Sequence, residues 1–596
     1  MFQTFDSATR PEQGPPRLSD LREVMAEVGV DAYLIPRADR FQGEYVAARD
    51  DRLAWLTGFT GSAGFAVVTR DKAGVFVDGR YRVQVRAQVA EVFTPLDWPA
   101  ITHADWLAEE LPKGGTVGFD PWLHTMEEID RLRSALPAHS FRAMENLIDR
   151  VWSDQPEPPA APITAHPLEF AGELHEAKRR RLAKELKVDG DAAALITLPD
   201  SVAWLFNIRG ADIPRNPIAH AFALLRADGT ANLLTDPEKC DAVRDHLGPE
   251  VAILPESELP ALLATLRGRV RIDPQSTPQA IADLLREAEV ETRHGTDPCR
   301  LPKAIKNEGE MAGMRDAHLR DATAMCRFLA WFDRADQTSL SEIDLVQSLE
   351  AFRRDTGMLR EISFDTIAGA GPNGALPHYR VTTDSNRDLI EGDLIVLDSG
   401  GQYPDGTTDI TRTLVVGTPG LEEARAYTLV LKGMIAISRA RFPRGVAGTH
   451  LDVLARYHLW LAGMDYDHGT GHGVGAYLCV HEGPQRLARG GDVALQPGMI
   501  LSNEPGYYRD GAFGIRIENL IAVQPADPLS GGDARDMLCF ETLTWVPIDR
   551  NLIDLSLLDP EERSWIDGYH ENCRDKIGPL LPDDCGEWFE AATEKL

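Results

Sequence analysis

Apolar residues in the carboxy-terminal half of the chain recur at helical spacing in long segments. Residues 308–334 and 421–441 carry apolar side chains at intervals of three and four, which predicts amphipathic helices. Another helix is predicted near 341–355, where Ser339 and Glu342 have the spacing of a capping box. Strand-rich stretches follow these helices. This half is therefore predicted to be an α+β domain rather than a series of alternating strand–helix units.

The amino-terminal half uses one apolar pattern twice. The segments DAYLIP, LAWL and FAVV, which begin at Asp31, Leu53 and Phe65, resemble DAAALI, VAWL and FALL, which begin at Asp191, Val202 and Phe222. Both sets follow the order strand, loop, short helix or turn, strand. A single structural unit present in two copies is the simplest explanation, with chance similarity of short apolar runs as the alternative.

Two proline-rich breaks divide the chain. Residues 154–167 contain five prolines, a density that resists helix and inner strand and is typical of a stiff linker. A second break at 294–307 precedes the first long helix. The breaks predict three domains, covering residues 1–154, 155–300 and 301–596.

Charge and composition narrow the class of protein. The formal net charge of -31 argues against a nucleic-acid or anionic-membrane surface, because both require a basic face. We expect no membrane span and no signal peptide, since long apolar runs are absent and no basic region precedes an apolar run at the start. Seven cysteines are scattered without a CxxC pair, which predicts reduced thiols in a cytoplasm.

Acidic residues flank the turns of two predicted hairpins. In residues 394–416 the turn signal is Pro404-Asp405-Gly406, and a simple hairpin would place Asp398 and Asp409 nearly opposite each other. In residues 499–523 the turn is Asp510-Gly511-Ala512, with Glu504 and Glu518 equidistant from it. Opposed like charges destabilise a sheet, so two such pairs in apolar strands indicate a compensating cation.

The stretch DHGTGHGVG, residues 467–475, carries His468 and His472 among four glycines. That many glycines make a helix improbable, and we expect them to let the backbone approach ions and substrate closely. One histidine would complete a metal shell with the four carboxylates, and the other would handle protons or hold substrate. This hard, oxygen-rich set suits two divalent ions bridged by water or hydroxide, with manganese favoured.

The ligand order resembles the signature of the pita-bread metallopeptidases, which include methionine aminopeptidases, prolidases and aminopeptidase P. From about residue 20 to about 580 the chain is similar to the cytosolic three-domain Xaa-Pro aminopeptidases. The motifs that carry this resemblance are GFTGSAG, DGRY, DPCRLPKAIKN, SFDTIAGAGPNGALPHYR, HGTGHGVG, VHEGP and NEPGYY.

The resemblance implies a fold, an activity and an assembly. Two related α/β creatinase-N-like domains would precede a pita-bread catalytic domain with a helical extension from about residue 551. The enzyme would be a cytoplasmic homodimer that releases the first residue from peptides with proline in second position. In that extension Trp565 and Tyr569 are four apart, consistent with one helix face.

The family also implies a role for each metal ligand. Asp409 and His472 would hold mainly one ion and Asp398 mainly the other, while Glu504 and Glu518 would be shared. A hydroxide between the ions would attack the peptide carbonyl.

Other residues would act on the substrate. Glu504 matches the family's proton-shuttling glutamate, and His378 and His481 would stabilise the tetrahedral intermediate. His468 would help form the proline pocket. Tyr507, like its neighbour Tyr508, is a candidate pocket wall, with core packing as the equal alternative. Arg516 shares a strand face with Glu518, so we expect it to contact the metal-binding carboxylates, with a surface salt bridge as the alternative. It is also a candidate substrate-binding residue.

Three other functions compete with this hypothesis. A prolidase, which cuts Xaa-Pro dipeptides, would have the same ligands, but the related prolidases carry one amino-terminal unit rather than two. A metal-free relative such as creatinase would have lost the ligand set. A non-catalytic binding protein of this fold would typically lack the acids.

Overall fold

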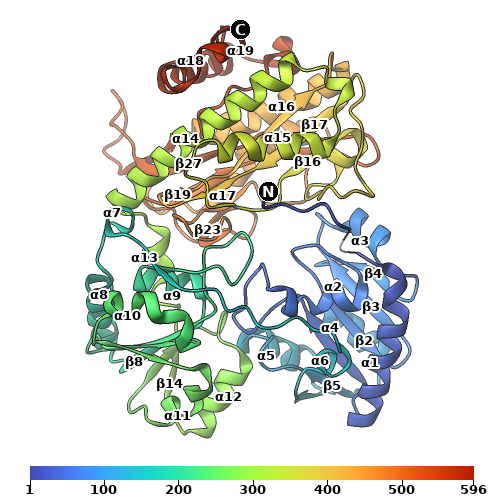
Figure 1. The fold of residues 1–596 in the computed structure, drawn as a ribbon, viewed down its shortest axis with the longest axis vertical. Coiled ribbons are helices and arrows are strands. Elements are labelled where there is room, and N and C mark those ends of the chain that lie inside the picture. The colour runs from blue at the N-terminus through green and yellow to red at the C-terminus, as the bar shows by residue number, and fades with distance from the viewer. Residues whose placement is uncertain (8) are drawn as a thin grey trace. The chain divides into compact units, whose positions relative to one another are not determined.

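The computed structural model describes residues 1–7 and 9–596, which form two compact units (Figure 1). One unit comprises Met1–Ser7 and Leu301–Leu596, and the other comprises Ala8–Arg300. The first seven residues thus belong with the carboxy-terminal half, whereas the linker pattern groups them with residues 8–154. Among the helices of the described chain, none combines the length and apolarity needed to cross a bilayer.

The unit Ala8–Arg300 contains two six-stranded sheets with the same topology. The strand orders are β4-β3-β2-β1-β5-β6 and β12-β11-β10-β8-β13-β14. In each sheet the second, third and fourth strands of this order pair antiparallel with one another, and the other three pairings are parallel. The repeat predicted from the apolar pattern is confirmed. The strands are β1 (Ala32–Pro36), β2 (Phe65–Thr69), β3 (Ala73–Val77), β4 (Thr94–Asp97), β5 (Thr116–Phe119), β6 (Ser140–Ala143), β8 (Ala193–Ile196), β10 (Phe222–Arg226), β11 (Ala231–Leu234), β12 (Val251–Leu254), β13 (Val270–Ile272) and β14 (Thr292–His294).

Helices connect the strands in equivalent places of the two repeats. LAWL lies in the helix after the first strand of one repeat and VAWL in the matching helix of the other. The main helices are α1 (Gly14–Val28), α2 (Arg52–Thr57), α3 (Arg82–Gln88), α4 (His103–Glu110), α5 (Met126–Ala135), α6 (Leu147–Val151), α8 (His175–Asp189), α9 (Pro199–Phe206), α11 (Leu259–Ala264) and α12 (Gln279–Glu287).

The two repeats pair through equivalent segments. Met126 N donates to Thr277 O at 3.0 Å, and Gln279 N donates to His124 O at 2.8 Å. Met126 and Gln279 are the first residues of α5 and α12, which occupy the same place in the two repeats. The contact is therefore isologous, like the interface of a two-fold symmetric dimer within one chain.

The unit of Met1–Ser7 and Leu301–Leu596 is called the catalytic unit, after the role that the resemblance implies for it. Its helices α14 (Glu308–Arg334), α15 (Glu342–Arg354) and α16 (Leu421–Ser438) begin close to their predicted positions, and α17 (Gly448–Leu461) follows them. The capping box of α15 was predicted two residues too early, because Ser341 and Asp344 form it. Glu342 is instead fully buried and accepts hydrogen bonds from Ala370 N and the Tyr379 hydroxyl at 2.8 Å each.

Strands of the catalytic unit form two three-stranded sheets, one six-stranded sheet and one two-stranded sheet. The orders are β15-β18-β19, β16-β17-β20, β21-β28-β27-β24-β22-β23 and β25-β26. All six residues of β17 and of β20 are buried, and α14, α15 and α16 contribute to the same hydrophobic core. The α+β prediction is confirmed. The strands are β15 (Glu361–Ile362), β16 (Ile367–Ala370), β17 (Leu394–Ser399), β18 (Gly401–Tyr403), β19 (Gly406–Thr407), β20 (Ile410–Val415), β21 (Phe442–Pro443), β22 (Gly471–Gly473), β23 (Glu482–Leu487), β24 (Ile500–Asn503), β25 (Gly506–Arg509), β26 (Phe513–Arg516), β27 (Asn519–Pro525) and β28 (Met537–Thr542).

The chain ends in two helices, α18 (Pro560–Ile577) and α19 (Gly586–Ala592). Trp565 stacks on Tyr569 with 5.3 Å between ring centroids, as their spacing predicts. Figure 1 shows both helices at the carboxy-terminal end of the catalytic unit.

Candidate metal centre

The first acidic pair lies on a hairpin whose register differs from the prediction. Asp398 in β17 is paired with Thr411 in β20, two residues beyond Asp409. The shift arises because Tyr403 pairs with Gly406, so the hairpin is centred one residue later than assumed. A shift of two residues keeps the same face of the sheet, so the two acids are diagonal neighbours instead of direct partners.

The second acidic pair has the predicted register. Asn503 pairs with Asn519 and Gly506 pairs with Arg516, so Glu504 and Glu518 are opposite each other in the gap between these ladders. Both are held by hydroxyl groups: Ser502 Oγ donates to Glu504 Oε1 at 3.0 Å, and Thr411 Oγ1 donates to Glu518 Oε2 at 2.8 Å. Sequence reasoning did not identify either hydroxyl, although each lies two residues along a strand face from a predicted ligand.

The glycines around His472 serve strand packing. His472 is the central residue of β22, which pairs with β23 and β24. A Cβ at Gly471 would lie 1.9 Å from Ser502 O, and one at Gly473 would lie 2.5 Å from Glu482 O. Only glycine permits these approaches, so close packing of the neighbouring strands requires these two glycines.

The five predicted ligands come together at one place, where Asp398, Asp409 and Glu518 are buried and His472 and Glu504 are partly exposed. One ligand atom each of Asp409, His472 and Glu518 lies within 4.8 Å of the others. His472 Nε2 is 3.5 Å from Asp409 Oδ2 and 3.4 Å from Glu504 Oε1. Its Nδ1 donates to Gly473 O at 2.9 Å, which leaves the Nε2 lone pair directed at the acids, as a metal-binding imidazole requires.

The electrostatics of this cluster fit a divalent cation. Burial raises the pKa of Asp398 to about 6, with Asp409 adding to the rise and Arg516 opposing it. Burial and the three neighbouring acids raise the pKa of Glu518 well above its usual value. Asp398 Oδ1 and Glu518 Oε1 are buried and accept no hydrogen bond from any described residue. Buried carboxylate oxygens without donors, crowded by like charges, are the chemistry expected of ligands to hard metal ions.

A hydrogen-bonded chain connects the cluster to His468. Arg516 Nη2 donates to Asp398 Oδ2 and its Nη1 donates to the Tyr508 hydroxyl, both at 2.6 Å. The His468 Nδ1 donates to Gly469 O, so its Nε2 accepts the Tyr508 hydroxyl at 2.9 Å. Arg516 thus contacts a predicted metal ligand, and Tyr508 joins Arg516 to His468.

The remaining predicted residues differ in what they contact. The His481 ring approaches His472 edge-on, with 4.3 Å between centroids. Tyr507 lies on the opposite strand face from Tyr508, where its ring packs against Phe513 and its hydroxyl accepts a bond from Arg509.

His378 follows a short helix, η6 (Gly371–Ala375), that packs on β26. The approach is close, because a Cβ at Gly514 would lie 1.7 Å from Gly374 O. The segment carrying His378 is therefore next to the strand that ends in Arg516.

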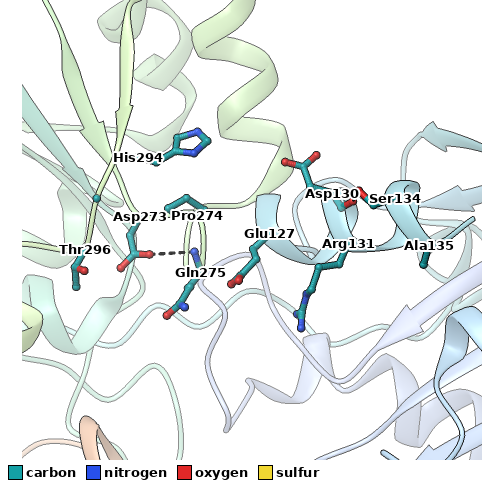
Figure 2. Close-up of a pocket in the computed structure, with 11 residues that line it drawn as sticks. Glu127, Asp130, Arg131, Ser134, Ala135, Asp273, Pro274, Gln275, His294 and Thr296 are labelled. Atoms are coloured by element: carbon teal, nitrogen blue, oxygen red, sulfur yellow. Dashed lines mark hydrogen bonds between the residues drawn. The ribbon is translucent and has the colours of Figure 1, made fainter. Parts of the chain in front are cut away.

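A separate cavity occurs in the unit Ala8–Arg300 (Figure 2). It has a volume of about 860 Å³ and lies between α5 and the carboxyl ends of β13 and β14. Glu127, Asp130 and Arg131 face it from one repeat, and Asp273 and His294 face it from the other. Its described lining includes none of the predicted site residues.

Comparisons with known protein families cover nearly the whole chain. Residues 312–525 match metallopeptidase family M24, and residues 536–596 match the C-terminal region of that family. Residues 17–151 and 154–310 each match the creatinase/prolidase N-terminal domain, as two copies of one unit require.

Individual relatives agree with the family match. The chain is 39% identical to the probable Xaa-Pro aminopeptidase P of Talaromyces stipitatus, over 97% of this chain and 92% of that protein. It is 38% identical to aminopeptidase P2 of Arabidopsis thaliana, over 95% and 86% of the two chains.

Solved structures show the same fold. The X-prolyl aminopeptidase of Caenorhabditis elegans, a cytosolic enzyme with a di-nuclear active site, superposes with a TM-score of 0.93 at 35% identity. That match covers 98% of this chain and 100% of the other. The Pyrococcus horikoshii prolidase matches over 99% of its own length but only 62% of this chain, with 26% identity and a TM-score of 0.51. With two creatinase N-terminal domains before a pita-bread catalytic domain, this chain belongs to the Xaa-Pro aminopeptidase P family of the M24 metallopeptidases.

Proposed function

We propose that this protein releases the amino-terminal residue from peptides that have proline in second position. A probable Xaa-Pro aminopeptidase P and aminopeptidase P2, at 39% and 38% identity, match 97% and 95% of the chain, whereas the P. horikoshii prolidase matches only 62% of it. The observation that carries the proposal is the convergence of four carboxylates and His472 on one place.

Asp398, Asp409, His472, Glu504 and Glu518 would hold two divalent ions, and the oxygen-rich set favours manganese. When bound, such ions supply a Lewis acid that lowers the pKa of water and polarises the scissile carbonyl. The di-nuclear site of the C. elegans relative supports this number of ions.

The protein's own groups would handle the protons. Glu504 would take a proton from the attacking water and deliver it to the proline nitrogen, which leaves as a secondary amine. Ser502 Oγ fixes its Oε1 with a hydrogen bond of 3.0 Å, and His472 Nε2 lies 3.4 Å from the same oxygen. His481 and His378 would donate hydrogen bonds to the oxygen of the tetrahedral intermediate.

Tyr508 is a better candidate for the proline pocket than Tyr507. Its hydroxyl bonds both His468 and Arg516, whereas Tyr507 packs on Phe513. We propose that His468 and Tyr508 together contact the proline ring, and that Arg516 orients Asp398.

Metal reconstitution with two substrates tests the proposal. Protein stripped with a chelator should be inactive, and Mn²⁺ should restore release of the first residue from an Xaa-Pro-Yaa tripeptide. Glu504→Gln should remain folded and inactive at saturating Mn²⁺. Preference for an Xaa-Pro dipeptide would indicate a prolidase. A metal-loaded wild type that cleaves neither substrate would support a binding protein instead.

We further propose a homodimer formed through α17. Val453, Leu454, Tyr457, Trp460 and Leu461 lie on this helix and are 37–71% exposed. Their spacing of three and four residues makes one apolar face, and a self-complementary face is what a two-fold dimer uses. Tyr457→Glu should shift the sedimentation coefficient to that of a monomer, whereas Leu529→Glu, at an exposed leucine in a loop, should not. A Tyr457→Glu protein that sediments like the wild type would contradict this interface.

A cytoplasmic location is proposed from the cytosolic C. elegans relative. Fractionation of cells that express the protein tests it, with a periplasmic or secreted pool as the contrary result. The domain boundaries at 154/155 and 300/301 stay predictions, to be checked by limited proteolysis.

A further inference from the structure

The first seven residues, Met1–Ser7, are structurally part of the catalytic unit. We call them the amino-terminal strap. Gln3 is only 2% exposed, and Phe5 packs against the main hydrophobic core. A terminal segment without such contacts would be poorly ordered, so its side-chain contacts define what it does.

Gln3 attaches the strap to the start of β16. Its Oε1 accepts Thr366 N at 2.7 Å, and its Nε2 donates to Thr366 O at 3.2 Å. The side-chain amide thus pairs with a backbone peptide as a neighbouring strand would. Thr366 directly precedes Ile367, which is paired with the candidate ligand Asp398.

The strap also holds the segment that follows His378. Arg380 Nη2 donates to Thr4 O at 2.8 Å, and its Nη1 donates to Asp6 O at 3.2 Å. Thr383 N donates to Phe5 O at 2.8 Å. Three successive strap carbonyls therefore accept bonds from residues within five positions of His378.

Helix α15 anchors both sides of this arrangement. Glu350, which is 3% exposed, accepts Phe2 N at 2.8 and 3.0 Å. Glu342, eight residues earlier on the same helix, accepts a hydrogen bond from the Tyr379 hydroxyl. Of the two residues that follow His378, Tyr379 is therefore bonded to α15 directly, and Arg380 is connected to α15 through the strap.

We propose that the amino-terminal strap is a positioning element for His378. It would act through Arg380 and Thr383 and limit the conformations of the loop that presents this imidazole to the substrate. The inference rests on the proposed role of His378 in hydrolysis. In the contacts that the structure describes, no strap residue touches a candidate metal ligand or a candidate substrate-binding residue.

Gln3→Met tests the proposal, because methionine has a similar length but cannot make either bond to Thr366. We expect kcat to fall on the order of tenfold, as for loss of two hydrogen bonds that orient a catalytic group. The affinity for Mn²⁺, measured by calorimetry, should stay within about twofold. Asp6→Asn is the matched control, since only the backbone oxygen of Asp6 is used, and it should match the wild type.

A double-mutant cycle separates positioning from general destabilisation. In a His378→Ala background, Gln3→Met should cause no further loss of kcat, because the group it positions is gone. An equal loss in both backgrounds would overturn the proposal.

Hydrogen exchange tests positioning without reference to activity. Amides of residues 377–383 should exchange faster in Gln3→Met and unchanged in Asp6→Asn. Unchanged exchange in Gln3→Met would refute the strap's role. If the wild type hydrolysed no Xaa-Pro peptide, the proposed function would fail, while the exchange result would still decide whether the strap orders this loop.

Discussion

Glu482 pairs with two buried lysines, and its removal should destabilise the catalytic unit strongly. Its Oε2 is 3.0 Å from Lys303 Nζ, and its Oε1 pairs with Lys306 Nζ. The three side chains are at most 2% exposed. Glu482→Gln would remove the carboxylate charge that both buried ammonium groups contact, and breaking such a buried pair costs about 3–5 kcal/mol.

That free energy converts into a measurable shift of melting temperature. The catalytic unit, Met1–Ser7 with Leu301–Leu596, has about 300 residues. At about 2.1 cal/mol/K per residue, its unfolding entropy is about 0.6 kcal/mol/K, so the expected decrease is roughly 5–8 °C. Differential scanning calorimetry of the Mn²⁺-loaded protein at one fixed metal concentration measures it.

Two control variants test the reasoning. Glu541 pairs with Arg315 at 2.7 Å on the surface, so Glu541→Gln should cost about 1 kcal/mol or less, a shift below roughly 2 °C. Lys306→Met keeps the pair of Lys303 with Glu482, so it should be much less damaging than Glu482→Gln. The argument would be refuted if Glu482→Gln melted within about 2 °C of the wild type, or if Lys306→Met were equally destabilising.

The two hairpins show how far strand register can be predicted from sequence. The turn residue Gly511 has a positive φ of +70°, and the register around it places Glu504 opposite Glu518 as expected. At the other hairpin the turn is centred one residue later than predicted, so the cross-strand partner of Asp398 is Thr411 instead of Asp409. The site still forms, because a two-residue shift preserves which face each carboxylate occupies.

Residues that are distant in sequence explain what could not be predicted. The bonds between Gln3 and Thr366 join positions 363 apart, and those between Lys303 and Glu482 join positions 179 apart. Periodicity and turn signals report neighbours along the chain, so neither contact leaves a local pattern. Glu342 failed as a cap for the same reason, since its burial against Tyr379 decided its role.

Three further changes should have measurable effects. Burial raises the pKa of Glu342 to about 7, so the folded state holds its proton up to near neutrality. The stability that this proton gives is present below the usual glutamate pKa and is lost as the pH rises towards 7. The unfolding free energy of the wild type minus that of Glu342→Gln, measured by urea unfolding, should therefore decline over that interval. A pH-independent difference would contradict this prediction. A fragment of the first repeat alone, ending near residue 153, lacks the second-repeat carbonyl that accepts Met126 N, so it should dimerise through α5. Analytical sedimentation measures this, and a monomeric fragment would contradict the isologous pairing. Arg516→Met removes the 2.6 Å donor to Asp398, and because such partners orient ligating carboxylates, Mn²⁺ affinity measured by calorimetry should fall about 10–100-fold, with unchanged affinity as the contrary result.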